Sequence, residues 1–249
     1  MSQLAPDLEV IRRRRILFLH HSVGRDVLAG IEQLDLEAGG SRLRLASLAE
    51  AARIDGPVLA HGSGGRNEDP RSKIEFFAST VRAGAPLRPD LALMKLCYVD
   101  FHPRTDVEEL LSAYRGGLES LKRDHPEIPF AHVTVPLCTR PTDPKSTLRR
   151  LMGREVWGDA ANVKRAQFNQ RLAESFPSDP IFDLARAEAA GPGGGAAAFE
   201  QGGLSYPCLH PRYTEDGGHL NPLGRRAAGA AAIRFLAAAL GGRREASCR

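Results

Sequence analysis

Three side chains in this sequence have the types and spacing needed to activate a hydroxyl group for attack on a carbonyl carbon. The segment DGGH, from Asp216 to His219, places a carboxylate three residues before an imidazole, and its glycines permit the tight backbone path that would bring the two groups together. A serine hydroxyl is a poor nucleophile until a base removes its proton, and that base needs an acceptor that holds its tautomer. Ser22, in the segment HHSVG, is the candidate nucleophile, with His219 as the base and Asp216 as the orienting acid.

Ser22 lies between a predicted strand and a predicted helix. The short apolar run from Ile16 to Leu19 ends at a turn, which is typical of a buried strand in a parallel sheet, and a helical pattern follows from about Arg25 to Leu36. His219 lies just before the last predicted helix, from Pro222 to Leu240. Because the loops at the carboxyl ends of parallel strands converge, we expect Ser22 and His219 to meet at one edge of the sheet.

Strands and helices alternate through most of the chain. The predicted strands are Ile16 to Leu19, Arg42 to Ser47, Asp90 to Val99, Phe130 to Leu137 and Ile181 to Leu184. The other predicted helices are one opened by Asp69-Pro70 and ended by Gly84, one from Thr105 to Arg123 and one from Asn162 to Phe176. This order predicts an α/β fold of the flavodoxin-like type, a three-layer α/β/α sandwich around a mainly parallel five-stranded sheet.

The length of 249 residues favours a single domain over two small ones. We expect this domain to span residues 15–240, between a flexible N-terminal segment, 1–14, and a flexible C-terminal tail, 241–249. The Gly- and Ala-rich stretch from Ala189 to Pro207 is predicted to be a mobile loop, which leaves open whether it acts as a lid over the site.

Two segments resemble sequence blocks of the SGNH, or GDSL-like, hydrolase family. The segment DGGHLNPLG, from Asp216 to Gly224, is similar to the family's last block, a DxxH followed by Asn and Gly, and ILFLHHSVG, from Ile16 to Gly24, is similar to the first. The region from Asn162 to Phe176 resembles the helix before the family's last strand. The resemblance covers about residues 15–240 and implies cleavage of a carboxylic ester, with a small acyl or O-acetyl group, through an acyl-enzyme on Ser22.

The resemblance also implies an oxyanion hole made by the N–H of the nucleophilic serine, a glycine N–H and an asparagine side chain. The glycine falls on HGSGGRN, where Gly62 is the preferred match and Gly64 is nearly as good. The asparagine position falls on Val99, which has no side-chain donor, so Asn67, Tyr98 or another backbone N–H would have to replace it.

Three further residues, His21, Tyr98 and Asp100, are candidates for contact with the substrate because they lie at or just after the ends of predicted strands at the expected site. His20-His21 stands where the family has Gly-Asp, so this chain resembles a divergent branch. The alternatives to a hydrolase are an O-acyltransferase with the same triad and a catalytically impaired binding protein of the same fold. The expected partner is a small-molecule or carbohydrate ester; the oligomeric state is not predicted.

Composition argues against several other classes. The net charge is +4 and aromatic residues make up 6%, a modest basic excess with few stacking groups, so no nucleic-acid partner is expected. The four cysteines are far apart and form no zinc-site spacing, so we expect no metal and no cofactor, and free thiols in the cytoplasm. The apolar run before Ser22 is too short for an export signal or a membrane helix, so no membrane partner is expected.

Overall fold

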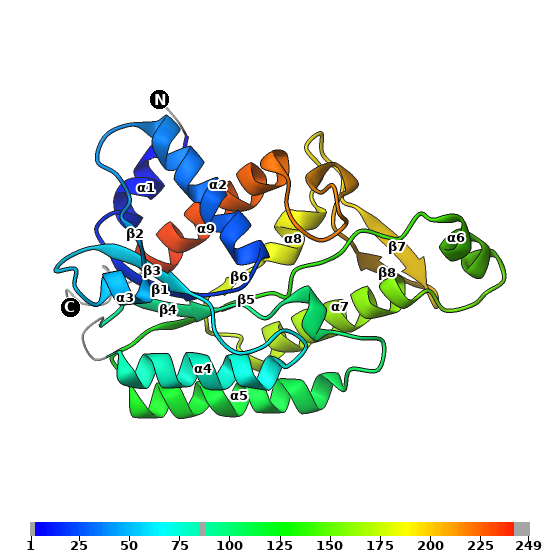
Figure 1. Ribbon diagram of the computed structural model, residues 1–249, viewed down its shortest axis with the longest axis horizontal. Helices are drawn as coiled ribbons and strands as arrows, with labels where there is room; N and C mark the ends of the chain where they lie inside the picture. The colour runs from blue at the N-terminus through cyan, green and yellow to red at the C-terminus, as the bar shows by residue number, and fades with distance from the viewer. Residues whose placement is uncertain (1–2, 85–87, 242–249) are drawn as a thin grey trace.

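A parallel sheet of six strands forms the centre of the computed structural model, which describes residues 3–84 and 88–241 (Figure 1). The strand order is β2-β3-β1-β4-β5-β6, and all of the paired neighbours run parallel. The strands are β1 (Arg15–Leu19), β2 (Leu45–Ser47), β3 (Val58–Gly62), β4 (Leu91–Met94), β5 (Phe130–Val133) and β6 (Ile181–Phe182). The predicted parallel sheet is confirmed, with six strands instead of five.

The strand that the sequence prediction missed is β3. It lies between β1 and β2, and its register with β1 pairs Leu19 with Gly62. Its apolar part is only Val58, Leu59 and Ala60, which is too short to distinguish a buried strand from a loop by periodicity alone. Pairing on both sides is what makes this segment a strand.

Helices cover both faces of the sheet, as Figure 1 shows. The side chains of β1 alternate between the two apolar clusters: Ile16 and Phe18 pack on one face, Leu17 and Leu19 on the other. One face carries α1 (Ala5–Ile11), α2 (Val23–Ala38), α8 (Leu184–Ala189) and α9 (Pro222–Gly241); the other carries α4 (Pro70–Ala83), α5 (Val107–Asp124) and α7 (Trp157–Ser175). The predicted three layers are therefore confirmed. A short helix, α3 (Leu48–Ala51), follows β2.

The N-terminal segment differs from the prediction of a flexible stretch over residues 1–14. It contains α1, whose Leu8 and Ile11 are buried against the core. Arg12 pairs with Asp35 of α2 at 2.7 Å, and both side chains are almost fully buried. The physical reason is that α1 is amphipathic and adds its apolar side to the helical layer of α2 and α9. Of the predicted C-terminal tail, residues 242–249 lie outside the described residues.

The region from Ala189 to Pro207 is also more ordered than predicted. It forms an antiparallel hairpin of β7 (Ala198–Gln201) and β8 (Leu204–Pro207), joined by Gly202 and Gly203. Phe199 is buried, and the guanidinium of Arg140 lies 5.2 Å from the centre of its ring. Phe199 and a backbone hydrogen bond from Ala197 to the Ala189 carbonyl therefore attach the hairpin to the body, and the prediction of a mobile loop is wrong for residues 198–207.

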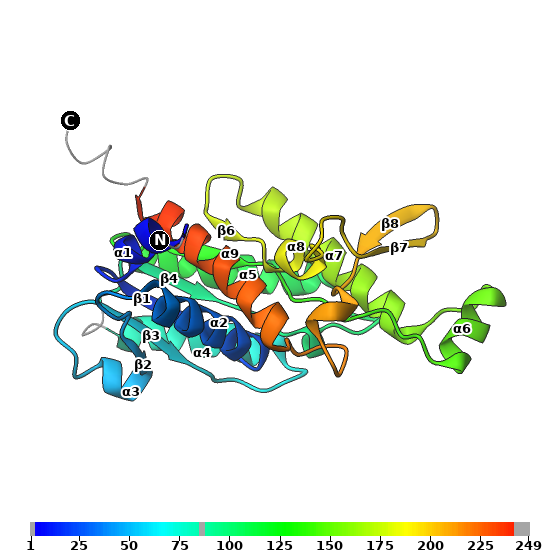
Figure 2. The ribbon, with the colours of Figure 1, turned by 90° about the horizontal axis from the view of Figure 1, so that it is seen from above.

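A segment that the sequence prediction left unassigned forms an arm between β5 and α7. After β5 the chain runs on in extended form, held by two amides of α7: Asn169 exchanges hydrogen bonds with the backbone of Val135, and Asn162 with that of Cys138. Helix α6 (Pro144–Leu151) follows and projects from the body, as both views show (Figures 1 and 2).

Helices α2 and α9 pack directly against each other through glycine. A Cβ atom on Gly30 of α2 would lie 1.9 Å from the carbonyl oxygen of Arg225, and one on Gly229 of α9 would lie 2.4 Å from the backbone of Gly30. The two backbones are therefore too close for any side chain at these positions. Since α2 begins just after Ser22 and α9 begins just after His219, this contact determines how the two ends approach each other.

We expect Gly30→Ala to lower the free energy of unfolding by about 1–3 kcal/mol, because the added methyl group would overlap the backbone of α9. The matched control is Gly116→Ala in the exposed face of α5, where nothing lies within 4 Å of the added Cβ. That variant should be neutral or more stable by up to about 1 kcal/mol, because alanine is the better helix former. Urea denaturation followed by circular dichroism measures both, and equal stability of the two variants would contradict the close packing.

Candidate active site

Ser22 is the N-cap residue of α2, three residues beyond the end of β1. Its carbonyl accepts hydrogen bonds from Arg25 and Asp26, but in the described part of the chain its hydroxyl makes no capping hydrogen bond. The side chain is exposed, and the backbone φ of 22° is uncommon for a residue other than glycine. Backbone strain of this kind gathers at functional sites. The simple role of a helix cap therefore does not explain Ser22.

Asp216 and His219 form a hydrogen-bonded pair in the loop before α9. The Nδ1 atom of His219 lies 2.6 Å from Asp216 Oδ2, while the other carboxylate oxygen accepts the backbone N–H groups of Gly218 and His219. These amide hydrogen bonds, and then the imidazole, hold the pKa of Asp216 well below its usual range. Gly217 has a φ of 89°, so the tight path of this loop requires glycine. The contact expected from the spacing is present.

Tyr98 lies on the other side of the imidazole. Its hydroxyl is 3.4 Å from His219 Nε2, and the two rings meet edge to face. The buried guanidinium of Arg165 donates two hydrogen bonds to the carbonyl of Tyr98, at 3.1 and 2.9 Å. Burial raises the pKa of Tyr98 to about 12, so the hydroxyl stays protonated near neutral pH. A neutral donor therefore faces the ring nitrogen that Asp216 leaves free.

Asp26 connects the two halves of the candidate site. It lies one turn after Ser22, accepts the backbone N–H of Leu220 at 3.1 Å and pairs with Arg225 of α9 at 2.8 Å. The first turn of α2 is thereby tied to the residue that follows His219. Within the described residues no hydrogen bond joins the Ser22 hydroxyl to His219, whose ring contacts are Asp216 and Tyr98.

Three of the predicted oxyanion donors, Gly62, Gly64 and Asn67, lie at the end of β3 and on the loop that follows it. Gly62 ends that strand, and its carbonyl accepts the backbone N–H of His20 at 2.9 Å. Gly64, the second choice, accepts a hydrogen bond from His21 Nε2 at 2.8 Å, so this loop contacts the two residues that precede Ser22. Asn67 is exposed, and its Oδ1 atom accepts from Lys73 at 3.1 Å, which leaves its amide N–H groups to donate elsewhere.

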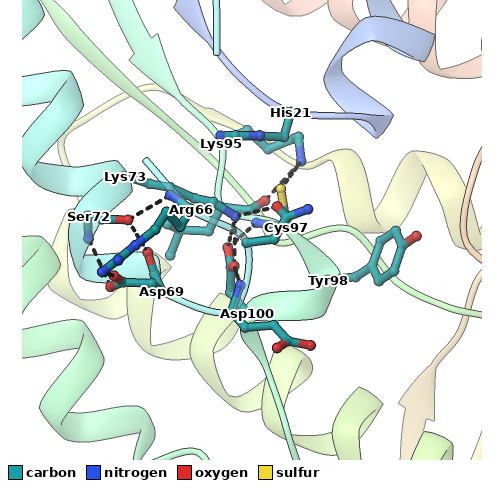
Figure 3. A network of polar contacts seen from close by, with 12 residues as sticks. His21, Arg66, Asp69, Ser72, Lys73, Lys95, Cys97, Tyr98 and Asp100 are labelled. Carbon is teal, nitrogen blue, oxygen red and sulfur yellow. Dashed lines mark hydrogen bonds and ion pairs between the residues drawn. The ribbon is translucent and has the colours of Figure 1, made fainter. Parts of the chain in front are cut away.

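Asp100, predicted to contact the substrate, is instead a support within the fold. Its side chain is fully buried and pairs with Lys73 Nζ at 2.7 Å, and it also accepts the backbone N–H groups of Cys97 and Glu68. Figure 3 shows Lys73 and Asp100 facing each other, whereas the ring of Tyr98 points away from this pair. The Asp100 oxygens serve Lys73 of α4 and two backbone N–H groups of neighbouring loops, so a substrate contact does not fit the position.

The two histidines before Ser22 have different environments. His20 is buried, its Nε2 atom lies 3.4 Å from His61 Nδ1, and burial lowers its pKa to about 3. His21 is half-buried, and burial lowers its pKa as well, while its contact with Gly64 opposes that shift. Both are therefore neutral near pH 7. His20 packs against Gly24, where a Cβ atom would lie 2.3 Å from the histidine side chain.

Several residues that hold the site were not identified from the sequence. Thr139 donates its backbone N–H to the Gly217 carbonyl at 2.8 Å, and the nearby Leu137 N–H is held by the buried carboxylate of Glu188 at 2.6 Å. Arg165 supports Tyr98 as described above. A signal existed for Arg165, because it falls at helical spacing between Ala161 and Phe168, which are buried. A charged residue on an apolar helix face indicates an internal partner.

Comparison with known proteins gives a likeness in structure only. No protein-family model and no curated protein matches this sequence. A Streptococcus pneumonia protein named for platelet activating factor has a TM-score of 0.50 and 14% identity over 94% of this chain and 91% of its own. A Parabacteroides merdae protein named as a GDSL-like lipase has a TM-score of 0.50 and 15% identity over 91% and 94%. This chain has the SGNH hydrolase fold.

The predicted fold is thus confirmed, and identities this low concern the fold alone. In this SGNH fold, no described group of three or more His, Cys, Asp and Glu side chains is arranged to hold a metal ion. No described helix is long and apolar enough to cross a membrane. Burial raises the pKa of the Cys138 thiol to about 11, so a thiolate nucleophile is not supported there.

Glu188 generates a prediction about pH. Burial raises its pKa from 4.5 to about 8, and one of its oxygens has no partner among the described residues. Between these two pH values the folded chain binds more protons than the unfolded chain, so this group makes the protein less stable as pH rises. We expect Glu188→Gln to gain stability relative to the wild type from about pH 5 to pH 8.

Urea denaturation at several pH values measures this difference, with Glu75→Gln on the exposed surface of α4 as the control. Glutamine keeps an oxygen that accepts from Leu137, so the variant isolates the ionisation. Parallel stability profiles of Glu188→Gln and the wild type would contradict a raised pKa at Glu188.

Proposed function

We propose that this protein is a serine hydrolase of the SGNH type that cleaves a carboxylic ester with a small acyl or O-acetyl group through an acyl-enzyme on Ser22. The observation that carries the proposal is the 2.6 Å contact of Asp216 with His219 Nδ1. It lies at the sheet edge that also holds Ser22, whose side chain is exposed and whose hydroxyl makes no capping hydrogen bond. The imidazole is oriented by the acid through Nδ1, and its Nε2 atom, which faces the Tyr98 hydroxyl at 3.4 Å, is the atom that we propose for proton transfer.

In the proposed reaction His219 takes the proton of Ser22 as the serine oxygen attacks the ester carbonyl carbon. Asp216 stabilises the imidazolium that forms, because its carboxylate stays ionised and accepts a hydrogen bond from Nδ1–H. The tetrahedral intermediate then expels the alcohol, which takes the proton back from His219. Water attacks the resulting acyl-serine by the same base catalysis and releases the carboxylic acid.

Tyr98 is our choice for the missing oxyanion donor among the alternatives that the sequence leaves open. Its hydroxyl is protonated near neutral pH and lies beside His219, whereas Val99 can donate no side-chain hydrogen bond. The backbone N–H groups of Ser22 and of Gly62 or Gly64 are the other proposed donors.

Hydrolysis is the outcome that we propose for the acyl-enzyme because the site is open to water. The side chains of His219 and Asp216 are 45% and 57% exposed, so water has access to an acyl group on Ser22. Acyl transfer to a hydroxyl acceptor is the alternative, and analysis of products formed with and without added sugars or alcohols separates the two. The free thiols of Cys97, Cys138 and Cys208 are in keeping with the cytoplasmic location that we propose.

Labelling with a fluorophosphonate tests whether Ser22 is activated. We expect an adduct on Ser22, located by mass spectrometry, that is absent in Ser22→Ala, and a labelling rate lower by about 10²–10⁴-fold in His219→Ala, because the general base is lost. Ser205→Ala, at an exposed position in the hairpin, is the matched control and should label like the wild type. A folded wild type that forms no adduct would favour the binding protein instead.

Replacement of the Tyr98 hydroxyl tests the proposed oxyanion donor. We expect Tyr98→Phe to lower kcat by about 10²-fold or more with little change in KM, because the donor acts on charge that develops in the transition state. Kinetics with p-nitrophenyl acetate measure both constants, and Tyr206→Phe on β8 serves as the control. An increase in KM with unchanged kcat would instead assign Tyr98 to substrate binding.

A further inference from the structure

The arm formed by α6 exposes a cluster of apolar side chains to solvent. Leu148 is 57% exposed, Leu151 81% and Met152 55%, and α6 contains no buried residue. These three positions follow the i, i+3, i+4 spacing that places residues on one face of a helix. Large apolar residues usually lie inside a fold, so an exposed group of three at the tip of a projecting element indicates a contact surface (Figures 1 and 2).

The opposite side of α6 attaches it to the body. Arg150 donates to Asp159 of α7 at 2.7 Å and to the carbonyl of Pro141 at 2.6 Å, and Asp143 caps the helix by accepting the N–H of Ser146. A helix this short is marginal without tertiary contacts. Since these polar contacts hold α6 from one side, Leu148 and Leu151 are turned away from the protein.

Positive charge borders the apolar face. Lys145 and Arg149 are both exposed, lie four residues apart and adjoin Leu148 and Met152 on the helix surface. Arg154 is exposed just after the helix. The surface is therefore complementary to one that is both apolar and anionic.

A lipid surface fits this chemistry better than a second copy of the chain. In a two-fold symmetric contact α6 would meet α6, so Lys145 and Arg149 would face the same cations of the partner. A bilayer with anionic headgroups offers acyl chains to Leu151 and negative charge to the two cations, and a projecting helix reaches a flat surface without obstruction from the body.

We propose that α6 is a peripheral docking element for anionic lipid surfaces, with Leu148, Leu151 and Met152 inserted among the lipids and Lys145 and Arg149 paired with headgroups. The sequence-based expectation of no membrane partner rested on the lack of an apolar run long enough to span a bilayer. Docking at the lipid surface needs no such run, so the proposal replaces that expectation. The arm begins near Thr139, which contacts Gly217 of the Asp216–His219 loop, so the docking helix is joined through the root of the arm to the candidate active site.

Cosedimentation of the full chain with vesicles tests the proposal, using phosphatidylcholine alone or mixed with phosphatidylglycerol. We expect binding to the mixed vesicles that weakens with added salt and is lost in the triple variant Leu148→Ser/Leu151→Ser/Met152→Ser. Lys145→Gln/Arg149→Gln should bind more weakly by about fivefold for each cation removed. The Ser22→Ala variant should bind like the wild type, because docking is independent of the proposed catalysis.

Two controls separate α6 from the general basic charge of the protein. Leu36→Ser/Leu204→Ser removes exposed apolar side chains elsewhere, and Arg53→Gln/Arg123→Gln removes exposed cations elsewhere; both should retain binding. Circular dichroism checks that each variant is folded. The proposal is overturned if the wild type does not bind mixed vesicles, if the triple variant binds equally well, or if ultracentrifugation shows a dimer that only the triple variant dissolves.

Discussion

The contact between α2 and α9 is the constraint on which the candidate site depends. Gly30 and Gly229 allow the two backbones to meet, and Asp26 adds a buried polar link from α2 to Leu220 and Arg225. The nucleophile candidate and the acid–base pair lie about two hundred residues apart in sequence, each immediately before one of these helices. Where the helices cross therefore determines where the two halves of the site meet, and any change in that crossing moves one half relative to the other.

Buried polar groups hold the loops around this contact. The pair of Asp100 and Lys73 connects the loop after β3 to the loop after β4, and the guanidinium of Arg165 donates hydrogen bonds to the carbonyl of Tyr98. Such groups are costly to bury unless they are paired, and each of these is paired with backbone or with an opposite charge. The result is a rigid base beneath exposed functional groups. Glu188 and His20 are exceptions, because one oxygen of Glu188 and the Nδ1 atom of His20 have no hydrogen-bond partner among the described residues.

The projecting arm differs from this buried polar base, because its apolar side chains are exposed to solvent. Its helix is held by polar contacts at Asp159 and Pro141 and leaves its apolar residues in solvent, which makes no contribution to the core. A surface of that kind has an unfavourable hydration free energy in isolation. The lipid contact that we propose would remove this cost and would explain why the apolar face of α6 points outward.

Local pattern determined much of this protein. Three features of the sequence predict the parallel layers, the Asp216–His219 pair and the place of that pair at the sheet edge. They are the apolar run before Ser22, the spacing of Asp216 and His219, and the proline that opens α9. Tertiary pairing decided the rest, because its cause lies in distant residues. The segment β3 is a strand only between β1 and β2, α1 is ordered by packing on α9, and the hairpin is attached by the buried Phe199 and by a backbone hydrogen bond from Ala197 to Ala189. Likewise Asp100 became a buried support and Tyr98 the neighbour of His219, since burial and partner choice arise only when separate loops are brought together.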